Sequence, residues 1–336
     1  MKHALLAYLC CPVCHHDLAL QVDRQDGTEI LDGQLVCAEC GHAYPIREGI
    51  PRLRTGEVPA IVQRNVEGFA YEWLRLEEPS PKYDAEFASY LGRWSARELF
   101  EGKIVLEAGC GMGKFLGCVQ RAGAATVIGV DLGESVHAAY RLTRHLPNVH
   151  VVQADLHAMP FREPFDVAYS IGVIHHLPSP AEGLRAVARH LNAAGQLFVW
   201  VYGKEGNEFF MRWIDPLRQL TCRLPRPVTE LLAKLIAAVL WGVIVGVYRP
   251  LARLGVRRLP LQEYFLYFHS LGFRFFWGTV LDKMVPDIQW FISREELSGW
   301  LQALGLEVQE VSQRNGHSWR ALSRKPASAS LEMVAG

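Results

Sequence analysis

Between residues 103 and 202, short apolar runs alternate with segments whose apolar residues recur every three or four positions. The apolar runs predict strands at 103–108, 126–131, 149–154, 165–171 and 195–202, and the periodic segments predict helices at 113–122, 134–145 and 180–191. Strands that alternate with helices through short connections form a parallel sheet with helices on both faces. The ligand of such a sheet lies beyond the carboxyl ends of its strands.

A similar pattern returns near the C-terminus. Ser293 and Glu296 form a capping box for a helix that stops at Gly305. The segments 306–312 and 317–324 then predict two further strands. The chain therefore divides into five parts: 1–54, a linker and aromatic helical cap at 55–100, a core domain at 101–203 and 291–326, an insertion at 204–290, and a tail rich in Ala and Ser at 327–336 that we expect to be disordered.

The first strand of the core domain leads into a glycine-rich turn. Glu107 precedes three glycines, Gly109, Gly111 and Gly113, before the next helix begins. Glycine lets the backbone bend sharply and lets a ligand lie against it, while the free N–H groups of the helix favour polar or anionic ligand groups. Asp131 ends the second strand, 20 residues after Gly111. A carboxylate at that position can accept hydrogen bonds from ribose hydroxyls.

With Asp155 and Leu156 after the third strand, this series resembles the class I S-adenosylmethionine-dependent methyltransferases, and among them the ubiquinone and menaquinone methyltransferases. The resemblance implies a seven-stranded Rossmann-like α/β sheet that ends in an antiparallel hairpin. It implies that the glycine turn holds the amino-acid end of the cofactor, Asp131 the ribose, and Asp155 with Leu156 the adenine. Four further residues are expected at the cofactor: Leu132, Ser170, Tyr71 and Trp73.

Tyr71 and Trp73 belong to an aromatic segment that runs from Phe69 to Trp94 at helical spacing. Packing against the next domain is one interpretation of this segment. The resemblance offers another, since in related methyltransferases an aromatic segment before the first strand closes over the cofactor.

The resemblance also implies that His175 and His176 face the methyl acceptor. Methyl transfer from a sulfonium needs chiefly that the nucleophile, methyl group and leaving sulfur be collinear. A base is useful when the acceptor is a hydroxyl or a carbon acid. His175 and His176 are the candidates, and Tyr202 is a weaker one.

Residues 1–54 carry Cys11, Cys14, Cys37 and Cys40 as two C-x-x-C pairs on either side of a hairpin pattern. Two such pairs predict a tetrahedral zinc site, and four thiolates leave no position open for catalysis. So small a module needs its metal to fold. Its tail resembles the zinc-ribbon family that includes activator subunits of tRNA and protein methyltransferases, in which the ribbon serves as partner or scaffold.

The insertion at 204–290 is rich in aromatic residues and holds a 14-residue run without charge, from Leu235 to Tyr248. That run is shorter than the ~20 residues of a membrane span, which favours a buried or interfacial helix. The segment from Arg212 to Lys283 contains eleven Lys and Arg residues and four Asp and Glu residues. We expect a lid over a small, largely apolar acceptor, with peripheral contact to an anionic membrane as a further expectation. A helical cap with solvated arginines is the plainer interpretation.

The formal net charge of zero argues against a surface that binds nucleic acid as a whole, although it leaves local basic patches open, and nucleic acid is not expected as a partner. The short apolar run before Cys10 is a poor secretory signal, which together with the cysteine pattern predicts a cytoplasmic protein. Two alternatives to small-molecule methylation stay open: an RNA or protein methyltransferase that docks its substrate through the ribbon, and a non-catalytic scaffold that keeps the cofactor site. A nicotinamide oxidoreductase fits less well, because Lys114 stands where the dinucleotide motif needs glycine.

Overall fold

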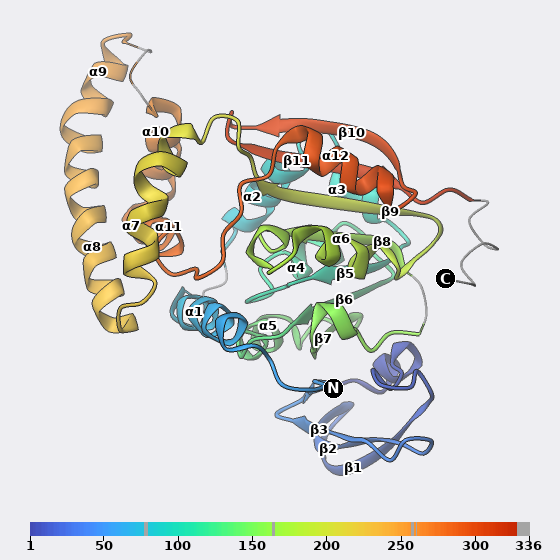
Figure 1. Cartoon of the computed structure of the whole chain (residues 1–336). Helices are drawn as coiled ribbons and strands as arrows, with labels where there is room; N and C mark the ends of the chain where they lie inside the picture. The colour runs from blue at the N-terminus through green and yellow to red at the C-terminus, as the bar shows by residue number, and fades with distance from the viewer. Residues whose placement is uncertain (77–79, 163–164, 257–258, 260, 328–336) are drawn as a thin grey trace.

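The structure is a computed structural model that describes residues 1–76, 80–162, 165–256, 259 and 261–327. Residues 328–336 of the expected tail lie outside the described residues. The chain forms a four-stranded sheet near the N-terminus and a seven-stranded sheet in the order β10-β11-β9-β8-β5-β6-β7 (Figure 1). The larger sheet contains β5 (Ile104–Ala108), β6 (Thr126–Asp131), β7 (Val149–Gln153), β8 (Phe165–Ile171), β9 (Leu191–Tyr202), β10 (Glu307–Arg314) and β11 (Ser318–Arg324).

The pairing of these strands confirms the predicted Rossmann-like α/β fold. Strands β5 to β9 run parallel, whereas β11 pairs antiparallel with β9 and β10 antiparallel with β11. The predicted strand ends agree with the structure within two residues except at β9. That strand begins at Leu191 rather than at 195, and Ala194 within it has a positive φ of 62°.

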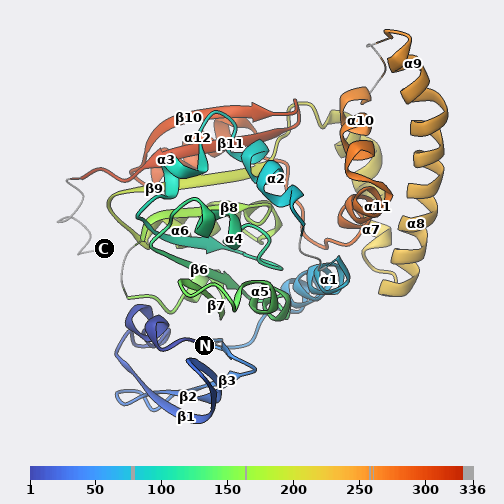
Figure 2. The same ribbon diagram turned by 180° about the vertical axis from the view of Figure 1, so that it is seen from behind.

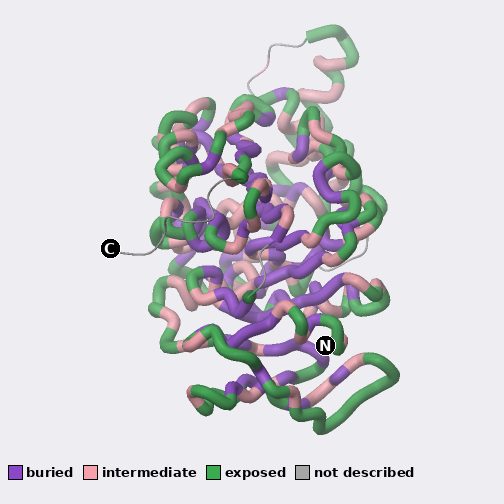
Figure 3. Tube along the Cα trace, turned by 90° about the vertical axis from the view of Figure 1, so that its right-hand side faces the viewer, coloured by how far each residue is buried: buried purple, intermediate pink, exposed green. Residues whose placement is uncertain are grey.

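Helices cover both faces of the larger sheet (Figures 1 and 2). One face carries α6 (Pro180–Ala188) and α12 (Arg294–Ala303), whose buried leucines belong to the same core as the strands. The other face carries α2 (Lys82–Leu91), α3 (Ala96–Phe100), α4 (Leu116–Arg121) and α5 (Val136–Thr143). The predicted capping box of α12 is present, with Ser293 and Glu296 exchanging hydrogen bonds. Buried residues follow the strands of this sheet (Figure 3).

The N-terminal module lies against the β7 edge of the larger sheet. It contains a short 3-10 helix, η1 (His3–Tyr8), and the strands β1 (Leu18–Asp26), β2 (Glu29–Cys37), β3 (Ala43–Arg47) and β4 (Ile50–Pro51). Three backbone hydrogen bonds among the described residues attach it: the Cys10 N–H donates to the Pro160 carbonyl, the Arg162 N–H to the Tyr8 carbonyl, and the Leu53 N–H to the Gln153 carbonyl. Leu5, Ile30 and Leu35 share a core with the sheet. The module is therefore docked as an integral part of the fold.

The insertion forms a separate helical group on one side of the molecule, next to α1 (Ala60–Leu76) (Figures 1 and 2). Its helices are η4 (Phe210–Ile214), α7 (Asp215–Thr221), α8 (Arg226–Val243), η5 (Ile244–Tyr248), α9 (Arg249–Arg253), α10 (Gln262–Leu271) and α11 (Phe273–Asp282). Small cores around Ala233 with Leu281, and around Ala237 with Phe276, join α8 to α11. Two short 3-10 turns, η2 (Leu156–Ala158) and η3 (Ile174–His176), complete the described elements.

The segment Arg226–Arg253 has the length and composition of a helix that could cross a membrane, which on its own is weak evidence of one. Only 17% of its most apolar window is buried. Small residues, Thr229, Ala233 and Ala237, face inward, whereas larger apolar side chains point away from the protein: Val228, Leu231, Leu235, Ile236, Val239 and Val243. A fully buried helix, one interpretation of the run from Leu235 to Tyr248, is therefore wrong.

Candidate functional site

A cavity of about 1020 Å³ opens between the carboxyl ends of the central strands, helix α1 and helices α10 and α11. One part of its wall comes from the sequence motifs: Glu107, Gly109, Gly111, Asp131, Leu132, Asp155 and Leu156. The other part is largely aromatic and comes from α1, β9 and the insertion: Phe69, Trp73, Trp200, Tyr264, Phe268, Phe275 and Phe291. The topology thus brings the motif residues and the insertion, far apart in sequence, to one space.

The glycine turn reaches the cavity through Gly109 and Gly111. Gly109 has φ 80°, and a Cβ on it would stand 2.4 Å from a methyl carbon of Val173. A Cβ on Gly111, at φ 51°, would lie 3.4 Å from Trp73 Nε1. Gly113 does not line the cavity, and a Cβ on it would lie 2.8 Å from the Cβ of Ala139 in α5. Gly109 and Gly111 thus place backbone in the cavity wall, whereas Gly113 lets the turn pack closely against α5.

Asp131 is fixed in the cavity wall by its own loop. Its Oδ2 accepts from the Gly111 N–H at 2.9 Å, and its Oδ1 accepts from the Gly133 N–H at 2.8 Å and from Ser135 Oγ at 3.2 Å. Burial raises the pKa of this carboxyl, while the backbone N–H groups oppose the rise. The remaining lone pairs can accept from ligand hydroxyls.

Glu107 ends in the cavity with an unpaired oxygen. Its side chain is 4% exposed, and its Oε2 has no hydrogen-bond partner among the described residues. Burial raises the pKa of this carboxyl to about 8. A cationic ligand group placed beside it would favour the ionised carboxylate. The ammonium group at the amino-acid end of S-adenosylmethionine has that charge, so the orphaned oxygen fits this cofactor.

Asp155 and Leu156 line the side of the cavity next to Asp131. The Asp155 Oδ1 accepts from the His157 N–H at 2.8 Å, and its hydrogen bonds with His157 lower the pKa of the carboxyl. Ser170 does not line the cavity, since its hydroxyl donates to the Ala108 carbonyl beneath the turn.

Tyr71 and Trp73 of α1, both predicted to lie at the cofactor, point in different directions. Trp73 lines the cavity over the glycine turn. Tyr71 faces the insertion, where its hydroxyl donates to Glu230 Oε2 at 2.6 Å and its ring lies 3.7 Å from the Arg75 guanidinium. The helix therefore contacts the cavity through Trp73 and the insertion through Tyr71.

The two histidines also differ in position. His176 lines the cavity, and its Nδ1 lies 2.8 Å from the Ile288 carbonyl, to which it donates. Burial lowers the pKa of this imidazole to about 4. His175 is fully buried, and its ring is tilted against that of Tyr202 with 4.0 Å between the ring centres. Neither of its ring nitrogens has a hydrogen-bond partner among the described residues. Tyr202 lines the cavity beside them.

Sequence reasoning missed several ionisable residues in this wall, among them Glu72, Asp282 and Lys283. Glu72 lies between Tyr71 and Trp73, the two aromatic residues chosen on α1. Asp282 is the last residue of α11, and Lys283 follows it. An acidic and a basic residue side by side at the end of an apolar lid helix were the sequence feature from which this part of the site could have been predicted.

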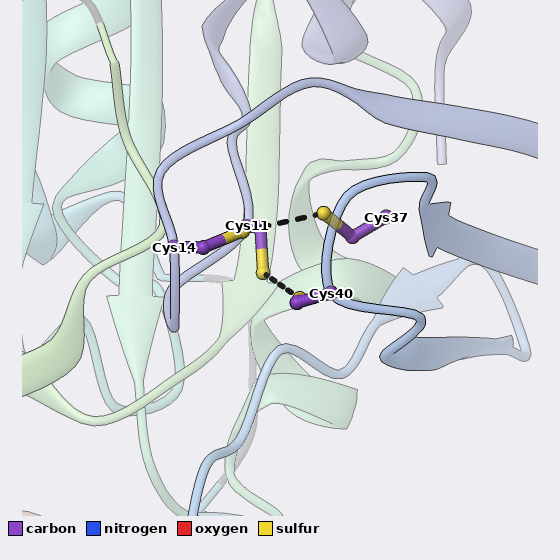
Figure 4. A group of neighbouring side chains, drawn as sticks. All are labelled: Cys11, Cys14, Cys37 and Cys40. Carbon is purple, nitrogen blue, oxygen red and sulfur yellow. Dashed lines mark hydrogen bonds between the residues drawn. The ribbon is translucent and has the colours of Figure 1, made fainter.

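The four motif cysteines lie together at one end of the N-terminal module (Figure 4). Their sulfur atoms all fall within 4.8 Å of one another. Cys11 and Cys40 are 3.5 Å apart and Cys14 and Cys37 3.4 Å, close to the separation that a tetrahedral zinc imposes. Four thiol ligands converging on one point are a closed donor set that fits a structural zinc.

Residues 106–199 match the family model described as methyltransferase domain, and residues 2–49 match that of Trm112p-like proteins. The tRNA U34 carboxymethyltransferase of Pseudoalteromonas translucida (strain TAC 125) is 31% identical over 114 residues, which are 33% of this chain and 35% of that protein. The ubiquinone biosynthesis O-methyltransferase of Hydrogenovibrio crunogenus (strain DSM 25203 / XCL-2) is 32% identical over 102 residues, 29% of this chain and 42% of that protein. The chain thus spans less than half the length of the curated relatives it matches.

Among solved structures, a complex between the Haloferax volcanii Trm112 methyltransferase activator and a methyltransferase has a TM-score of 0.49 at 14% identity. The likeness covers 78% of this chain and 96% of that one.

The family matches and the cysteine cluster confirm S-adenosylmethionine and structural zinc as the cofactors. The expectation that nucleic acid is no partner is wrong, because several matching relatives are tRNA U34 carboxymethyltransferases. A net charge of zero averages over the whole surface and so excludes no local binding site. The ubiquinone-like branch is not singled out either, since relatives of both kinds match at similar identity.

Proposed function

We propose that the protein is an S-adenosylmethionine-dependent methyltransferase whose acceptor enters the cavity from the side of the insertion. One observation carries this proposal: the cofactor motifs and the aromatic residues of the insertion line the same cavity of about 1020 Å³. That volume is at the upper end of the range for small-molecule sites, so it leaves room for an acceptor beside a cofactor.

The residues of the motif wall would hold the cofactor. Asp131 accepts from the ribose hydroxyls, Glu107 faces the ammonium group, and the backbone at Gly109 and Gly111 lies against the amino-acid end. When bound, the cofactor supplies a methyl group on a positively charged sulfur. Trp73 covers the turn and excludes water, and its ring can face the sulfonium charge. The protein contributes mostly by positioning, which can be worth ~7–11 kcal/mol.

The rest of the wall favours an acceptor with a flat, largely apolar body. Trp200 of β9, Tyr264 and Phe268 of α10, and Phe291 after the insertion converge on the same space. Aromatic rings of this kind bind apolar and planar groups by stacking and by burying their surface. Residues 204–290 are thus the acceptor lid in this proposal, and α1 with Trp73 is the cap over the cofactor.

A base of an RNA is the second candidate acceptor. The matching tRNA U34 carboxymethyltransferases act on a nucleic acid by name. A flipped-out base stacks on aromatic side chains in the same way as a small planar molecule. Arg274 lines the cavity and is exposed, so it could contact a phosphate, whereas Arg218 and Arg314 are buried and hydrogen-bonded to the protein.

Transfer of a labelled methyl group separates these acceptors. The purified protein is incubated with S-adenosylmethionine labelled in its methyl group, together with a cellular lipid extract or with total tRNA. Label in the organic extract supports the apolar acceptor, and label in nuclease-sensitive material supports the RNA base. Asp131→Ala is the cofactor-site control and should abolish both. No label in either fraction, with cofactor binding intact, would favour the non-catalytic alternative.

We further propose that the protein works in the cytoplasm. All eight cysteines are unpaired, including the four at the zinc site, and thiols of this kind persist in a reducing compartment.

A further inference from the structure

A group of ionisable side chains interrupts the aromatic wall of the cavity. Tyr202 ends β9, Asp282 and Lys283 end α11, and all three line the cavity. The Tyr202 hydroxyl donates to Asp282 Oδ2 at 3.1 Å. Lys283 Nζ lies 3.6 Å from Asp282 Oδ2 and 3.6 Å from the centre of the Tyr202 ring. A carboxylate, an ammonium group and a phenol are therefore in mutual contact.

This group lies among buried aromatic and imidazole rings, including those of His175 and His176 at 4.0 and 5.8 Å from the Tyr202 ring. The Tyr202 ring lies 5.3 Å from that of Trp200 and 6.2 Å from that of Phe291. Charges in such surroundings cost free energy unless they are paired and hydrogen-bonded. Ionisable clusters in a ligand cavity are more common at functional sites than at structural ones. A purely structural role would be met as well by apolar side chains.

Glu72 adds a second observation from another element. Its side chain on α1 is 1% exposed, it lines the cavity, and its Oε2 has no hydrogen-bond partner among the described residues. Burial, and then the charge of Asp282, raise the pKa of this carboxyl well above its usual value. An unpaired buried oxygen costs free energy that a polar ligand group can recover. The ligand therefore has a polar group at this end of the cavity.

We propose that Glu72, Tyr202, Asp282 and Lys283 bind a hydroxyl group of the acceptor and remove its proton, so that oxygen is the atom methylated. This inference rests on the proposed methyltransferase activity and adds the acceptor group to it. Tyr202 and Asp282 are the catalytic residues, and Lys283 holds the charge of Asp282 in place.

In this step the acceptor oxygen forms a bond to the methyl carbon while the bond from that carbon to sulfur breaks, and the electron pair of that bond stays on sulfur. The hydroxyl proton passes to Tyr202 Oη as the proton of Tyr202 passes to Asp282 Oδ2. The products are a methyl ether, S-adenosylhomocysteine and a protonated Asp282. Neutral hydroxyls are weak nucleophiles and need this proton transfer, whereas a neutral amine already has an available lone pair.

His176 is less suited to this role. Its Nδ1 donates to the Ile288 carbonyl, and burial lowers the pKa of the imidazole to about 4. Its protonated form is disfavoured because the effect of burial exceeds that of the nearby Asp282 charge. In the proposed step His176 therefore orients the acceptor and Asp282 takes the proton.

The first test measures binding alone. The protein loaded with S-adenosylhomocysteine is titrated with 4-heptylphenol and with heptylbenzene, which lacks the hydroxyl, by calorimetry. We expect the phenol to bind at least about tenfold more tightly, because its hydroxyl completes the polar group. Tyr202→Phe and Asp282→Asn should remove this preference. Equal or tighter binding of heptylbenzene by the parent protein, or failure of the phenol to bind, would overturn the proposal.

The second test measures transfer to 4-heptylphenol and to 4-heptylaniline. Methylation of the phenol oxygen supports the proposal, and methylation of the aniline alone contradicts it. Asp282→Asn should slow transfer about 10²-fold or more with unchanged affinity for S-adenosylhomocysteine. Asp23→Asn and Tyr8→Phe, outside the cavity, are the matched controls. If neither compound is methylated, the binding preference decides. Loss of cofactor binding in the parent protein would instead contradict the proposed function itself.

Discussion

The Arg52 guanidinium of the zinc module donates to the Gln153 side-chain oxygen at the end of β7, with 2.8 Å between Nη1 and Oε1. The same nitrogen lies 3.1 Å from Glu134 Oε1, and Gln153 Nε2 donates to the Leu132 carbonyl. Leu132 and Glu134 follow Asp131 by one and three residues, and Gln153 precedes Asp155 by two. The zinc module thus contacts both loops that carry Asp131 and Asp155, the carboxylates proposed to bind the cofactor.

Weakening this contact should lower cofactor affinity without removing a cofactor ligand. We expect Arg52→Met to weaken S-adenosylhomocysteine binding about three- to tenfold. The two loops lose a charged hydrogen bond worth ~1.5–3 kcal/mol, and only part of that free energy is transmitted to the cofactor site. Calorimetry measures the effect. Arg24→Met, which removes an exposed pair with Asp32 in the same module, is the control. An unchanged affinity in Arg52→Met would mean that the module only supports the fold.

Zinc removal should destabilise the whole chain, since the module shares a core with the larger sheet. Each chain is expected to carry one zinc, and Cys37→Ser should lower the melting temperature and release the metal. Metal analysis and thermal unfolding check this expectation. Cys222→Ser, in the insertion, is a cysteine control away from the site. Normal melting of a metal-free Cys37→Ser protein would contradict it.

Asp131 provides the most direct test of the cofactor site. Hydrogen bonds from two ribose hydroxyls to one carboxylate are charge-assisted, so Asp131→Ala should weaken cofactor binding by about 2–3 kcal/mol. Asp131→Asn should recover part of this loss, because it keeps an acceptor oxygen for the N–H groups of the loop. Calorimetry with S-adenosylhomocysteine measures both variants. Equal affinity in Asp131→Ala and the parent protein would place the ribose elsewhere.

The sequence predicted the parts of the molecule whose chemistry is local. Strands of the parallel sheet are buried on both faces and so appear as continuous apolar runs, and the C-x-x-C pairs have a fixed spacing. The role of Gly113 could not be predicted from its motif, because only the fold brings Ala139 of α5 within 2.8 Å of the position of a Cβ on Gly113.

Contacts between distant segments were the parts that the sequence could not predict. Asp282 and Tyr202 form a hydrogen bond although they are 80 residues apart in the sequence, and no sequence feature near either residue predicts this bond. Of the two alternatives for α8, a buried or an interfacial helix, the buried one fails for a related reason. An apolar run predicts burial only if another element covers it, and its neighbour α11 contacts the small residues of its inner face.

The outer face of α8 can be tested with a matched pair of substitutions. Leu231 is 58% exposed, whereas Leu281 on α11 is fully buried in the same insertion. Leu231→Ala should change the free energy of unfolding by less than about 0.5 kcal/mol, and Leu281→Ala should cost ~2–5 kcal/mol. Urea denaturation measures both. A comparable loss in Leu231→Ala would show that the outer face of α8 is covered in solution.

His176 makes a prediction about pH, whose sign follows from its burial. Burial lowers the pKa of the folded protein's imidazole to about 4, from an ordinary value of 6.5. Between these values the unfolded chain binds more protons, so the free energy of unfolding should fall as pH drops from about 6.5 toward 4. His176→Gln should make this fall shallower, by up to about 1.4 kcal/mol for each unit of pH in that range.

His157→Gln is the control and should make the fall steeper. The hydrogen bond to Asp155 raises the pKa of His157, so this histidine stabilises the folded protein at low pH. The comparison uses urea unfolding at pH 7.5, 6 and 5, and zinc-ligand protonation cancels because all three proteins share it. Parallel pH curves for His176→Gln and the parent protein would mean that His176 is charged or exposed in solution, and it would then return as a candidate base.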